Sequence, residues 1–392
     1  MGISHIVMIR HKHTCPHLPQ TWRGSHQPMR RPFFTFLIFA FLVNCAELWA
    51  IEVRRAEPLT QMALSSGHQQ PPDINDAARF IAGLTVTGTG PLAGWEQTPE
   101  WISFSRTINQ NWDRFKVSRL GRIRPWANSH LSSLNPTTVF YPFSGPDFIF
   151  ARELFPNAST YILCGLEPVG SQPSPQNLQP LHSSLGWMEV SMRSLMDAGY
   201  FVTKEMRVDL KQSPLQGTLP LFCFMLARNG DRIQSVQTTT NHAEIRFLAR
   251  GDSRVRTLHY FNLNLSNGSM GKGNAFVQFL KSARPDVCYL KSASYLLHEG
   301  DFSIIRELLL TQCRAIVQDD SGIPLRSFAP ERWRYRNFGV YAPPLDIFKK
   351  YYQPDLAALY AKRPSKPLPF GVGYHWDPKT ANLMVFTATA SP

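Results

Sequence analysis

Hydrophobic residues follow a helical pattern between residues 74 and 130. Apolar side chains recur there at steps of three and four residues, the spacing of one face of an α-helix. The clearest run consists of Trp101, Phe104, Ile108, Trp112 and Phe115. This pattern predicts a mostly helical N-terminal part over residues 74–130.

The pattern changes at residues 137–167, where two runs rich in β-branched and aromatic residues flank a turn and an amphipathic stretch. Residues 137–141 and 160–167 predict strands, residues 142–147 a turn, and residues 148–155 a short helix. Strand, helix and strand in this order form a βαβ crossover, whose strands are parallel. We therefore expect a βαβ unit over residues 137–200, with a further helix at residues 185–198.

Residues 201–265 predict an antiparallel section of the sheet. The expected strands lie at residues 201–202, 219–227, 232–238, 243–248 and 254–265. The segments Asn229-Gly230-Asp231 and Arg250-Gly251-Asp252 are typical of hairpin turns.

Alternation of strands and helices returns over residues 274–392. Helices are expected at residues 274–283, 302–311 and 345–352, and strands within 287–297, 314–318 and 383–389. The predicted fold class is a single α/β domain over residues 74–392. It has a Rossmann-like, mostly parallel sheet with an antiparallel hairpin section and a helical N-terminal part.

Residues 29–50 have the pattern of a secretory signal peptide. Arg30 and Arg31 precede an apolar segment of about 11 residues, shorter than the roughly 20 residues of a membrane-spanning helix. We expect cleavage after Ala50, a linker at residues 51–73, and a true start at Met29 that leaves residues 1–28 as an upstream extension. The expected location is the periplasm or cell envelope. An uncleaved inner-membrane anchor and a lipoprotein attached through Cys45 are the alternatives.

The formal net charge of +13 narrows the choice of partners. The basic residues are spread along the chain, whereas nucleic-acid binding needs a concentrated basic face, so we predict no nucleic-acid partner. A general attraction to anionic surfaces is favoured instead. Residues 332–336 alternate arginine with Trp333 and Tyr335 and would suit an anionic ligand, although a solvated loop is the preferred interpretation.

Four cysteines follow the predicted signal peptide, and each lies in an apolar run. This context favours buried free thiols. An oxidising compartment would also allow disulfides, and the sequence does not choose among the three full pairings. The four residues are Cys164, Cys223, Cys288 and Cys313.

Three short motifs resemble those of a family of exported bacterial proteins with no established activity. They are the segments at residues 141–147 (YPFSGPD), 165–170 (GLEPVG) and 318–324 (QDDSGIP). The resemblance covers most of the mature chain and implies export.

A more distant resemblance links the βαβ unit to the nucleotide-binding half of class I methyltransferases. In that family a glycine-rich turn follows the first strand and an acid ends the second, which are the places of Gly145 and Glu167 here. The usual Gly-x-Gly is absent, and Pro142 and Pro146 flank the turn. Glycines let a cofactor approach the backbone, so their loss leads us to predict no S-adenosylmethionine and no other cofactor.

Residues at the C-terminal ends of the predicted strands are the candidates for a ligand site, because parallel strands end at one edge of a sheet. The expected ligand-binding residues are Tyr141, Ser144, Gly145, Asp147, Glu167 and Ser321. We place His298 near the rim of this site. Structural alternatives remain open: a local backbone bond for Ser144, a helix cap for Asp147 and a salt bridge for Glu167.

Whether this site catalyses a reaction is left open by the sequence. The catalytic candidates are Ser144, His298, Asp319 and Asp320, which would form a hydrolase triad only if their strands end close together. The two aspartates are also typical turn residues. No metal-binding spacing such as His-Glu-x-x-His occurs, so we predict no metal site.

The leading interpretation is an exported protein that binds a small-molecule or envelope ligand at its strand tips. A non-catalytic envelope scaffold on a methyltransferase-like fold and a periplasmic hydrolase using Ser144 are the alternatives.

The N-terminal pattern gives a first prediction. Protein isolated from its native host is expected to begin near residue 51, because a signal peptidase would cut after Ala50. N-terminal sequencing of the envelope fraction measures this. A cytosolic protein that starts at Met1 would contradict it.

Overall fold

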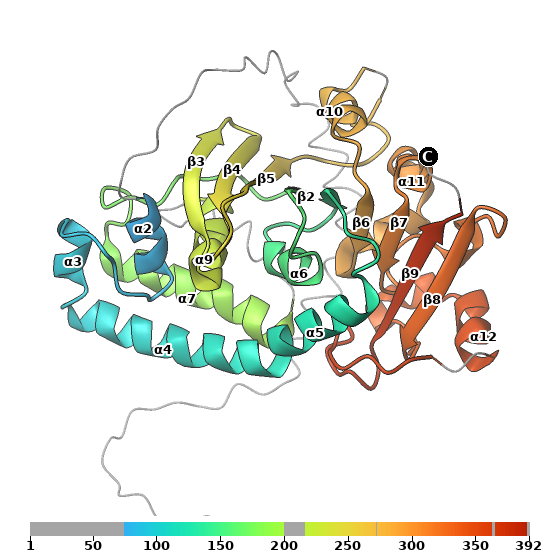
Figure 1. Ribbon diagram of the computed structural model, residues 1–392, viewed down its shortest axis with the longest axis horizontal. Coiled ribbons are helices and arrows are strands. Elements are labelled where there is room, and N and C mark those ends of the chain that lie inside the picture. Colours follow the sequence, from blue (N-terminus) through green and yellow to red (C-terminus); the bar gives the residue numbers. More distant parts are fainter. Residues whose placement is uncertain (1–73, 200–215, 272, 363–364, 390–392) are drawn as a thin grey trace, which may run out of the picture.

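The structure, a computed structural model, describes residues 74–199, 216–271, 273–362 and 365–389. A nine-stranded mixed sheet runs through this part of the chain, in the order β3-β4-β5-β2-β1-β6-β7-β9-β8 (Figure 1). The strands are β1 (Thr138–Tyr141), β2 (Thr160–Gly165), β3 (Arg232–Thr238), β4 (His242–Leu248), β5 (Val255–Asn262), β6 (Val287–Leu290), β7 (Ala315–Gln318), β8 (Trp333–Gly339) and β9 (Asn382–Ala388).

The middle of the sheet is parallel and its flanks are antiparallel. Strands β5, β2, β1, β6 and β7 run in one direction, with Val139 opposite both Tyr161 and Val287. Strand β4 is antiparallel to β3 and β5, and β9 is antiparallel to β7 and β8. The predicted βαβ unit and the predicted antiparallel hairpin section are therefore confirmed.

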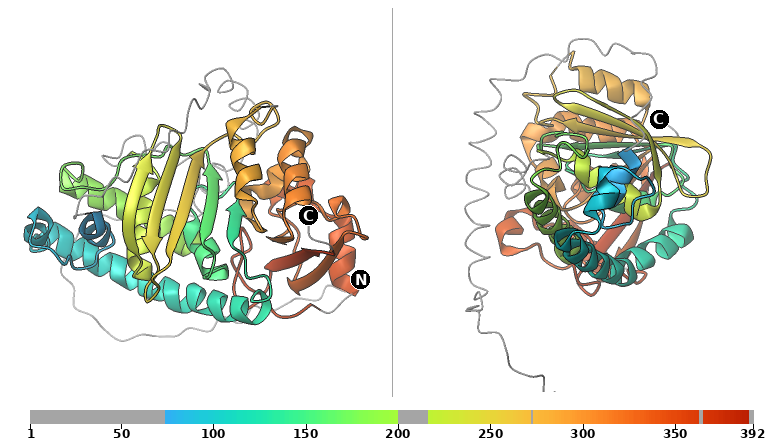
Figure 2. Two further views of the ribbon diagram at one scale, coloured as in Figure 1. Left: turned by 45° about the horizontal axis from the view of Figure 1, so that its top comes forward. Right: turned by 90° about the vertical axis from the view of Figure 1, so that its left-hand side faces the viewer.

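Helices cover both faces of the sheet, and successive strand residues alternate between two cores (Figures 1 and 2). Val139 and Tyr141 contribute to the core on one face, whereas Phe140 between them belongs to the core on the other. The first face is covered by α2 (Ile74–Ile81), α4 (Pro99–Phe115), α5 (Gly121–His130), α6 (Phe148–Leu154), α7 (Leu181–Ala198) and α9 (Leu219–Asn229), with the short α3 (Pro91–Trp95) beside α2. The second is covered by α10 (Ala275–Ala283), α11 (Ser303–Gln312) and α12 (Pro354–Lys362).

The predicted helical N-terminal part is present and forms a long ridge along one side of the sheet (Figure 1). Helix α4 begins at Pro99, after Thr98, whose hydroxyl accepts a hydrogen bond from the Trp101 N–H. The predicted apolar stripe from Trp101 to Phe115 is buried. A π-helical turn at Lys116–Leu120 then joins α4 to α5.

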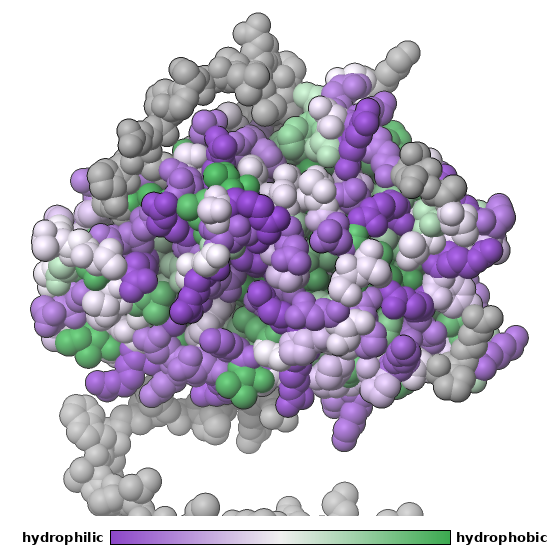
Figure 3. All heavy atoms as spheres, in the orientation of Figure 1, coloured by the Kyte–Doolittle hydropathy of each residue, from purple (hydrophilic) through white to green (hydrophobic). Residues whose placement is uncertain are grey.

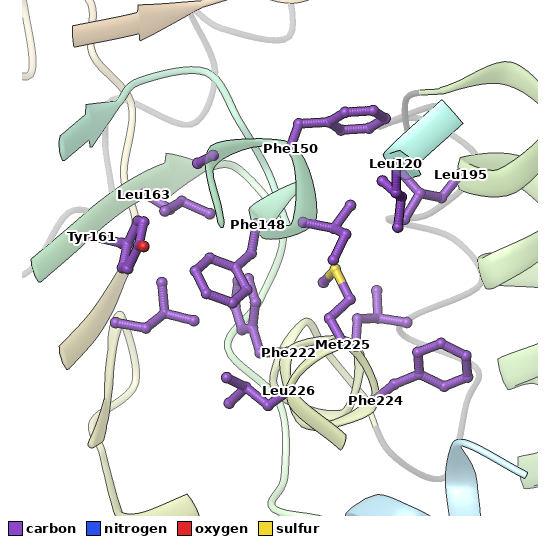
Figure 4. Close-up of a cluster of buried hydrophobic side chains, with 14 of the residues drawn as sticks. Leu120, Phe148, Phe150, Tyr161, Leu163, Leu195, Phe222, Phe224, Met225 and Leu226 are labelled. Carbon is purple, nitrogen blue, oxygen red and sulfur yellow. The ribbon is translucent and has the colours of Figure 1, made fainter. Parts of the chain in front are cut away.

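Helices α6 and α9 fill the centre of the first core. All seven residues of α6 are buried, and the Phe148 ring lies 5.2 Å from that of Tyr161 on β2. Figure 4 shows Phe222 and Met225 of α9 pointing toward α6 and β2. This packing fixes the crossover between β1 and β2.

Three predicted elements are wrong. Residues 219–227 form the buried helix α9 and not a strand, because an apolar run of this length fits either structure and the core selects the helix. The following Gly230 has a left-handed backbone that ends α9, so residues 229–231 are a helix end and not a hairpin turn.

The third wrong element is the loop expected at residues 332–336, where the chain forms the edge strand β8. The turn at residues 250–252 joins β4 to β5 as predicted. Residues 345–352 form a short 3-10 helix, Asp346–Tyr351. The strand expected at residues 201–202 lies outside the described residues.

The four cysteines are buried free thiols, as favoured from their apolar context. Burial raises the pKa of each thiol, to about 12 for Cys223 and Cys313, so these side chains behave as small apolar groups.

The position of Phe148 gives a prediction about stability. Phe148→Ala is expected to lower the free energy of unfolding by about 3–5 kcal/mol, because the side chain is fully buried between α6, β2 and β4. Chemical denaturation measures this. Val117→Ala, at a side chain that is 76% exposed, is the control and should change stability by less than about 0.5 kcal/mol. Equal effects of the two substitutions would contradict this arrangement of the core.

Candidate functional site

Buried polar residues gather where the parallel strands end. Strands β1, β2, β6 and β7 point the same way, so the residues that follow them share one edge of the sheet. Asp147 follows β1, Glu167 follows β2, Lys291 follows β6 and Asp319 follows β7, and each is at most 3% exposed. With Asp320, which follows Asp319, five charged side chains are buried at this edge of the sheet. Buried charges are costly unless ion pairs or hydrogen bonds compensate them.

The first group joins the ends of β1 and β6. The Lys291 ammonium forms a buried ion pair with Asp147 Oδ2, which also accepts a hydrogen bond of 3.1 Å from the Tyr141 hydroxyl. Lys291 Nζ donates in addition to the Gly199 carbonyl at 2.8 Å. Burial raises the pKa of Asp147 to about 6, although Lys291 and Tyr141 both oppose this rise. The second oxygen, Asp147 Oδ1, is buried without a hydrogen-bond partner.

The second group joins the ends of β6 and β7. Asp319 Oδ2 accepts the Ser292 N–H at 3.1 Å, and Oδ1 accepts the Ser321 N–H at 2.9 Å and the Ser321 hydroxyl. Burial and the neighbouring charge of Asp320 raise the pKa of Asp319 to about 7. Ser292 has a φ of +60°, rare for a residue with a side chain, and its buried hydroxyl has no partner.

Asp320 points toward a different set of partners. Its Oδ2 accepts the Tyr295 hydroxyl and its Oδ1 accepts the Asn382 amide at 3.1 Å. His375 Nε2 lies 3.8 Å from Oδ1, too far for a hydrogen bond, and has no other partner. Tyr295 stacks on Tyr351 with ring centroids 5.1 Å apart, so an aromatic wall covers this carboxylate.

A segment from the C-terminal part of the chain covers the edge. We call residues 370–376 the capping segment; it turns at Val372 and His375, whose backbones exchange two hydrogen bonds. Gly373 has a φ of +57° and approaches so closely that a Cβ there would overlap Asp319 Oδ2. Trp376 packs on Gly199 and beneath the Arg119 guanidinium, which donates to the Trp376 carbonyl at 2.8 Å.

A small cavity remains between the capping segment and the sheet. The empty space there is about 240 Å³ when open solvent is included, but the centre of a water-sized sphere can occupy only about 10 Å³ of it, so the cavity has room for about one water molecule. Lys291 is its one charged lining residue among those described, and the rest of the wall is apolar or glycine. The lining residues are Ile123, Phe150, Leu154, Gly199, Tyr289, Lys291, Phe370, Gly371, Val372, Gly373 and Trp376.

Glu167 and Gly145 form a separate group over β2 and β5. Tyr260 donates its hydroxyl to the Glu167 carbonyl at 2.8 Å and lies 3.3 Å from Oε2. The Glu167 carboxylate lies against the backbone of Gly145 and Gly165, where a Cβ on either glycine would meet it. The predicted ligand residue Glu167 is therefore turned onto the predicted glycine turn.

The other predicted residues take local positions. The Ser144 hydroxyl lies within hydrogen-bond distance of the Gly145 and Cys164 carbonyls, at 3.0 and 3.2 Å, the local backbone bonding left open as its alternative. His298 Nε2 bonds the Gly322 carbonyl at 2.8 Å, and burial lowers the His298 pKa to about 4. Within the described residues no hydrogen bond joins Ser144, His298 and Asp319. Asp147 begins α6, but its side chain makes no capping bond, because it faces Lys291.

Several residues of the edge were missed from the sequence. Lys291 lies inside the range 287–297 in which a strand was expected, and only the observed end of β6 at Leu290 places it at this edge. No sequence pattern placed the capping segment at this edge, because the residues that it contacts are far from it in the chain. The missed residues are Tyr295, Lys291, Ser292, His375, Trp376 and Asn382.

In the described part of the chain, no group of three or more metal-ligating side chains is arranged to hold an ion. None of the helices described there is both long and apolar enough to cross a membrane. Comparison with known proteins gave no matching family model, no matching curated protein and no matching solved structure.

The raised pKa of Asp319 gives a prediction about pH. A carboxyl group whose pKa rises from 3.8 to about 7 on folding binds more protons in the folded state between those values, so its ionisation lowers stability as the pH rises. Asp319→Asn cannot ionise. The stability of the wild type relative to Asp319→Asn is therefore expected to fall by at least about 1 kcal/mol between pH 4 and pH 7.

Urea denaturation of both proteins across this pH range measures the difference. Comparing the two proteins cancels the opposite contribution of His298, whose lowered pKa makes stability rise with pH. A difference that is constant with pH would show that Asp319 is ionised throughout.

Proposed function

We propose that the protein binds a small molecule in the crevice between the ends of β1 and β6 of a Rossmann-like sheet. Taken in chain order, the five parallel strands have the spatial order 3-2-1-4-5, which matches the first five positions of the Rossmann order 3-2-1-4-5-6. The antiparallel strands β4 and β9 lie one position in from the two edges of this sheet. In open sheets of this kind, ligands bind where the strand order reverses, which is between β1 and β6 here.

One observation carries the proposal: the cavity lies at this reversal point. Its wall includes Tyr289 and Lys291 from the end of β6, and Phe150 and Leu154 from the helix that follows β1. The ion pair between Lys291 and Asp147 spans the same two strands. A buried charged pair seldom improves stability over an apolar pair, so its presence here favours a role in binding.

The chemistry of the cavity favours a small, mostly apolar ligand with one polar end. Ligand pockets for drug-sized molecules usually exceed about 300 Å³, whereas this cavity has room for about one water molecule, so only the polar end of a small ligand fits without movement of the capping segment. Lys291 lines the cavity whereas Asp147 does not, so the Lys291 ammonium is the polar group that a ligand meets there, and it suits a hydrogen-bond acceptor. A hydroxyl or amide oxygen can accept this bond.

The turn at residues 142–147 is less suited to binding a cofactor than the cavity beside Lys291 is to binding a ligand. The carboxylate of Glu167 lies on Gly145 and Gly165, at the face of the turn that a phosphate or ribose would approach. We therefore do not propose S-adenosylmethionine as a ligand. The bonds from Ser144 to local carbonyls likewise favour binding over hydrolysis by this serine.

The proposed location is the periplasm or cell envelope. The support is the sequence pattern of residues 29–50, which lie outside the described residues. An envelope ligand is consequently the most direct choice of partner.

Native mass spectrometry of protein purified from the host envelope tests the proposal. Wild-type protein is expected to carry a small-molecule mass that the double variant Lys291→Met/Asp147→Asn loses. The double substitution removes both charges together, so neither partner is left as a buried unpaired ion and the fold is retained.

The control is the exposed ion pair of Lys350 and Glu299, 2.7 Å apart. Lys350→Met/Glu299→Gln also removes one ion pair and should keep the bound mass. The proposal fails if wild-type protein carries no added mass, or if the Lys291→Met/Asp147→Asn protein retains it.

A further inference from the structure

The arginines of the edge strand β8 do not line the cavity. Strand β8 begins beside the end of β9, where Trp333 pairs with Ala388, so its first residues lie at the sheet edge opposite the strand tips. Arg334 and Arg336 are both exposed and point to the same face, because side chains alternate along a strand. Their Cα atoms are about 6.5–7 Å apart at this spacing. Arg332 precedes them, and Lys366 lies beside Phe338 at the far end of β8.

Main-chain carbonyls hold the three guanidinium groups in place. Arg332 donates to Thr311 at 3.0 Å, Arg334 to Pro330 at 2.6 Å and Arg336 to His130 at 2.7 Å. Each group keeps further N–H donors for another partner, since a guanidinium has five. In the described part of the chain, none of the three forms an ion pair with a carboxylate.

The positive charge of this face is only weakly offset. Glu331 is the one acidic residue among residues 326–339, against four arginines. Burial is the main cause that lowers the pKa of His130, and the positive charges of Lys366 and Arg336 lower it further. The His130 side chain therefore lies near both cations. Figure 3 shows the surface over β8 and α12 as mostly hydrophilic.

The aromatic residues of β8 face the other way. Trp333 is 4% exposed, and Tyr335 packs against the same second core. Proteins that bind single-stranded nucleic acids combine basic residues with exposed aromatic rings on which bases stack. In β8 the rings of Trp333 and Tyr335 pack in the second core. The exposed face of the strand therefore carries positive charge but no aromatic ring on which a base could stack.

We propose that the β8 face, formed by Arg334, Arg336 and Lys366, binds an acidic polysaccharide. An extended chain with repeated carboxylate or sulfate groups can place one anion at each arginine along the strand. Arginine binds such anions through paired N–H donors, which suits fixed guanidinium groups. This site is independent of the proposed cavity.

Binding of the full chain to two fluorescent polysaccharides tests the proposal: heparin for sulfate groups and polygalacturonate for carboxylate groups. Arg334→Gln/Arg336→Gln is expected to weaken binding to at least one of them by about tenfold. The slope of log affinity against log salt should become shallower by about 2, roughly 1 for each lost charge contact. Arg334→Lys/Arg336→Lys keeps the charges and should retain most of the salt dependence.

Arg232→Gln/Arg246→Gln is the matched control. Both residues are exposed arginines on β3 and β4, at the other end of the sheet, and the control removes the same net charge. It should change the affinity by less than twofold, and thermal unfolding should show that every variant is folded.

Three outcomes would overturn the proposal. Equal losses in the two double Gln variants would mean that net charge alone attracts polyanions. No binding of wild type to either polysaccharide would remove the partner. Tighter binding of an oligo-dT strand than of both polysaccharides, lost in Arg334→Gln/Arg336→Gln, would assign the β8 face to a nucleic acid.

Discussion

Five adjacent parallel strands impose the main constraint on this structure. Parallel neighbours cannot be joined by a tight turn, so each connection crosses a face of the sheet, usually through a helix. Both faces are then covered, and every strand residue needs an apolar partner on one side or the other. The alternation of Val139, Phe140 and Tyr141 between two cores follows directly.

The same constraint gathers polar residues at the C-terminal ends of the strands. Because the parallel strands run in one direction, the residues that follow them lie at one edge of the sheet, where the surrounding elements bury them. The charges of Asp147, Lys291 and Asp319 are therefore paired or have shifted pKa values, and unpartnered atoms such as Asp147 Oδ1 remain. Polar atoms without partners are costly in a dry site.

The C-terminal ends of the parallel strands are covered by another segment of the chain, whereas the edge strand β8 is exposed on one side. The strand tips are covered by the capping segment, which brings Gly373, His375 and Trp376 onto residues more than fifty positions earlier in the chain. The edge strand β8 stays open on one side and carries arginines. Charged residues on an edge strand discourage pairing with other chains, so these arginines protect the edge whatever else they bind.

Local sequence patterns determined the elements whose signals are local. The stripe from Trp101 to Phe115 required a helix, and the run at residues 137–167 required a βαβ unit, because periodicity and turn residues act over a few positions. The ends of the predicted strands at residues 137–141, 160–167 and 314–318 located Asp147, Glu167 and Asp319 at one edge of the sheet. The tertiary structure alone decided that residues 219–227 are helical, since an apolar run without a clear period takes its form from the core around it. It also decided that Asp147 faces Lys291, that Glu167 turns onto Gly145, and that the capping segment closes the edge. These contacts join residues far apart in the chain, and their energies depend on burial, which no local pattern records.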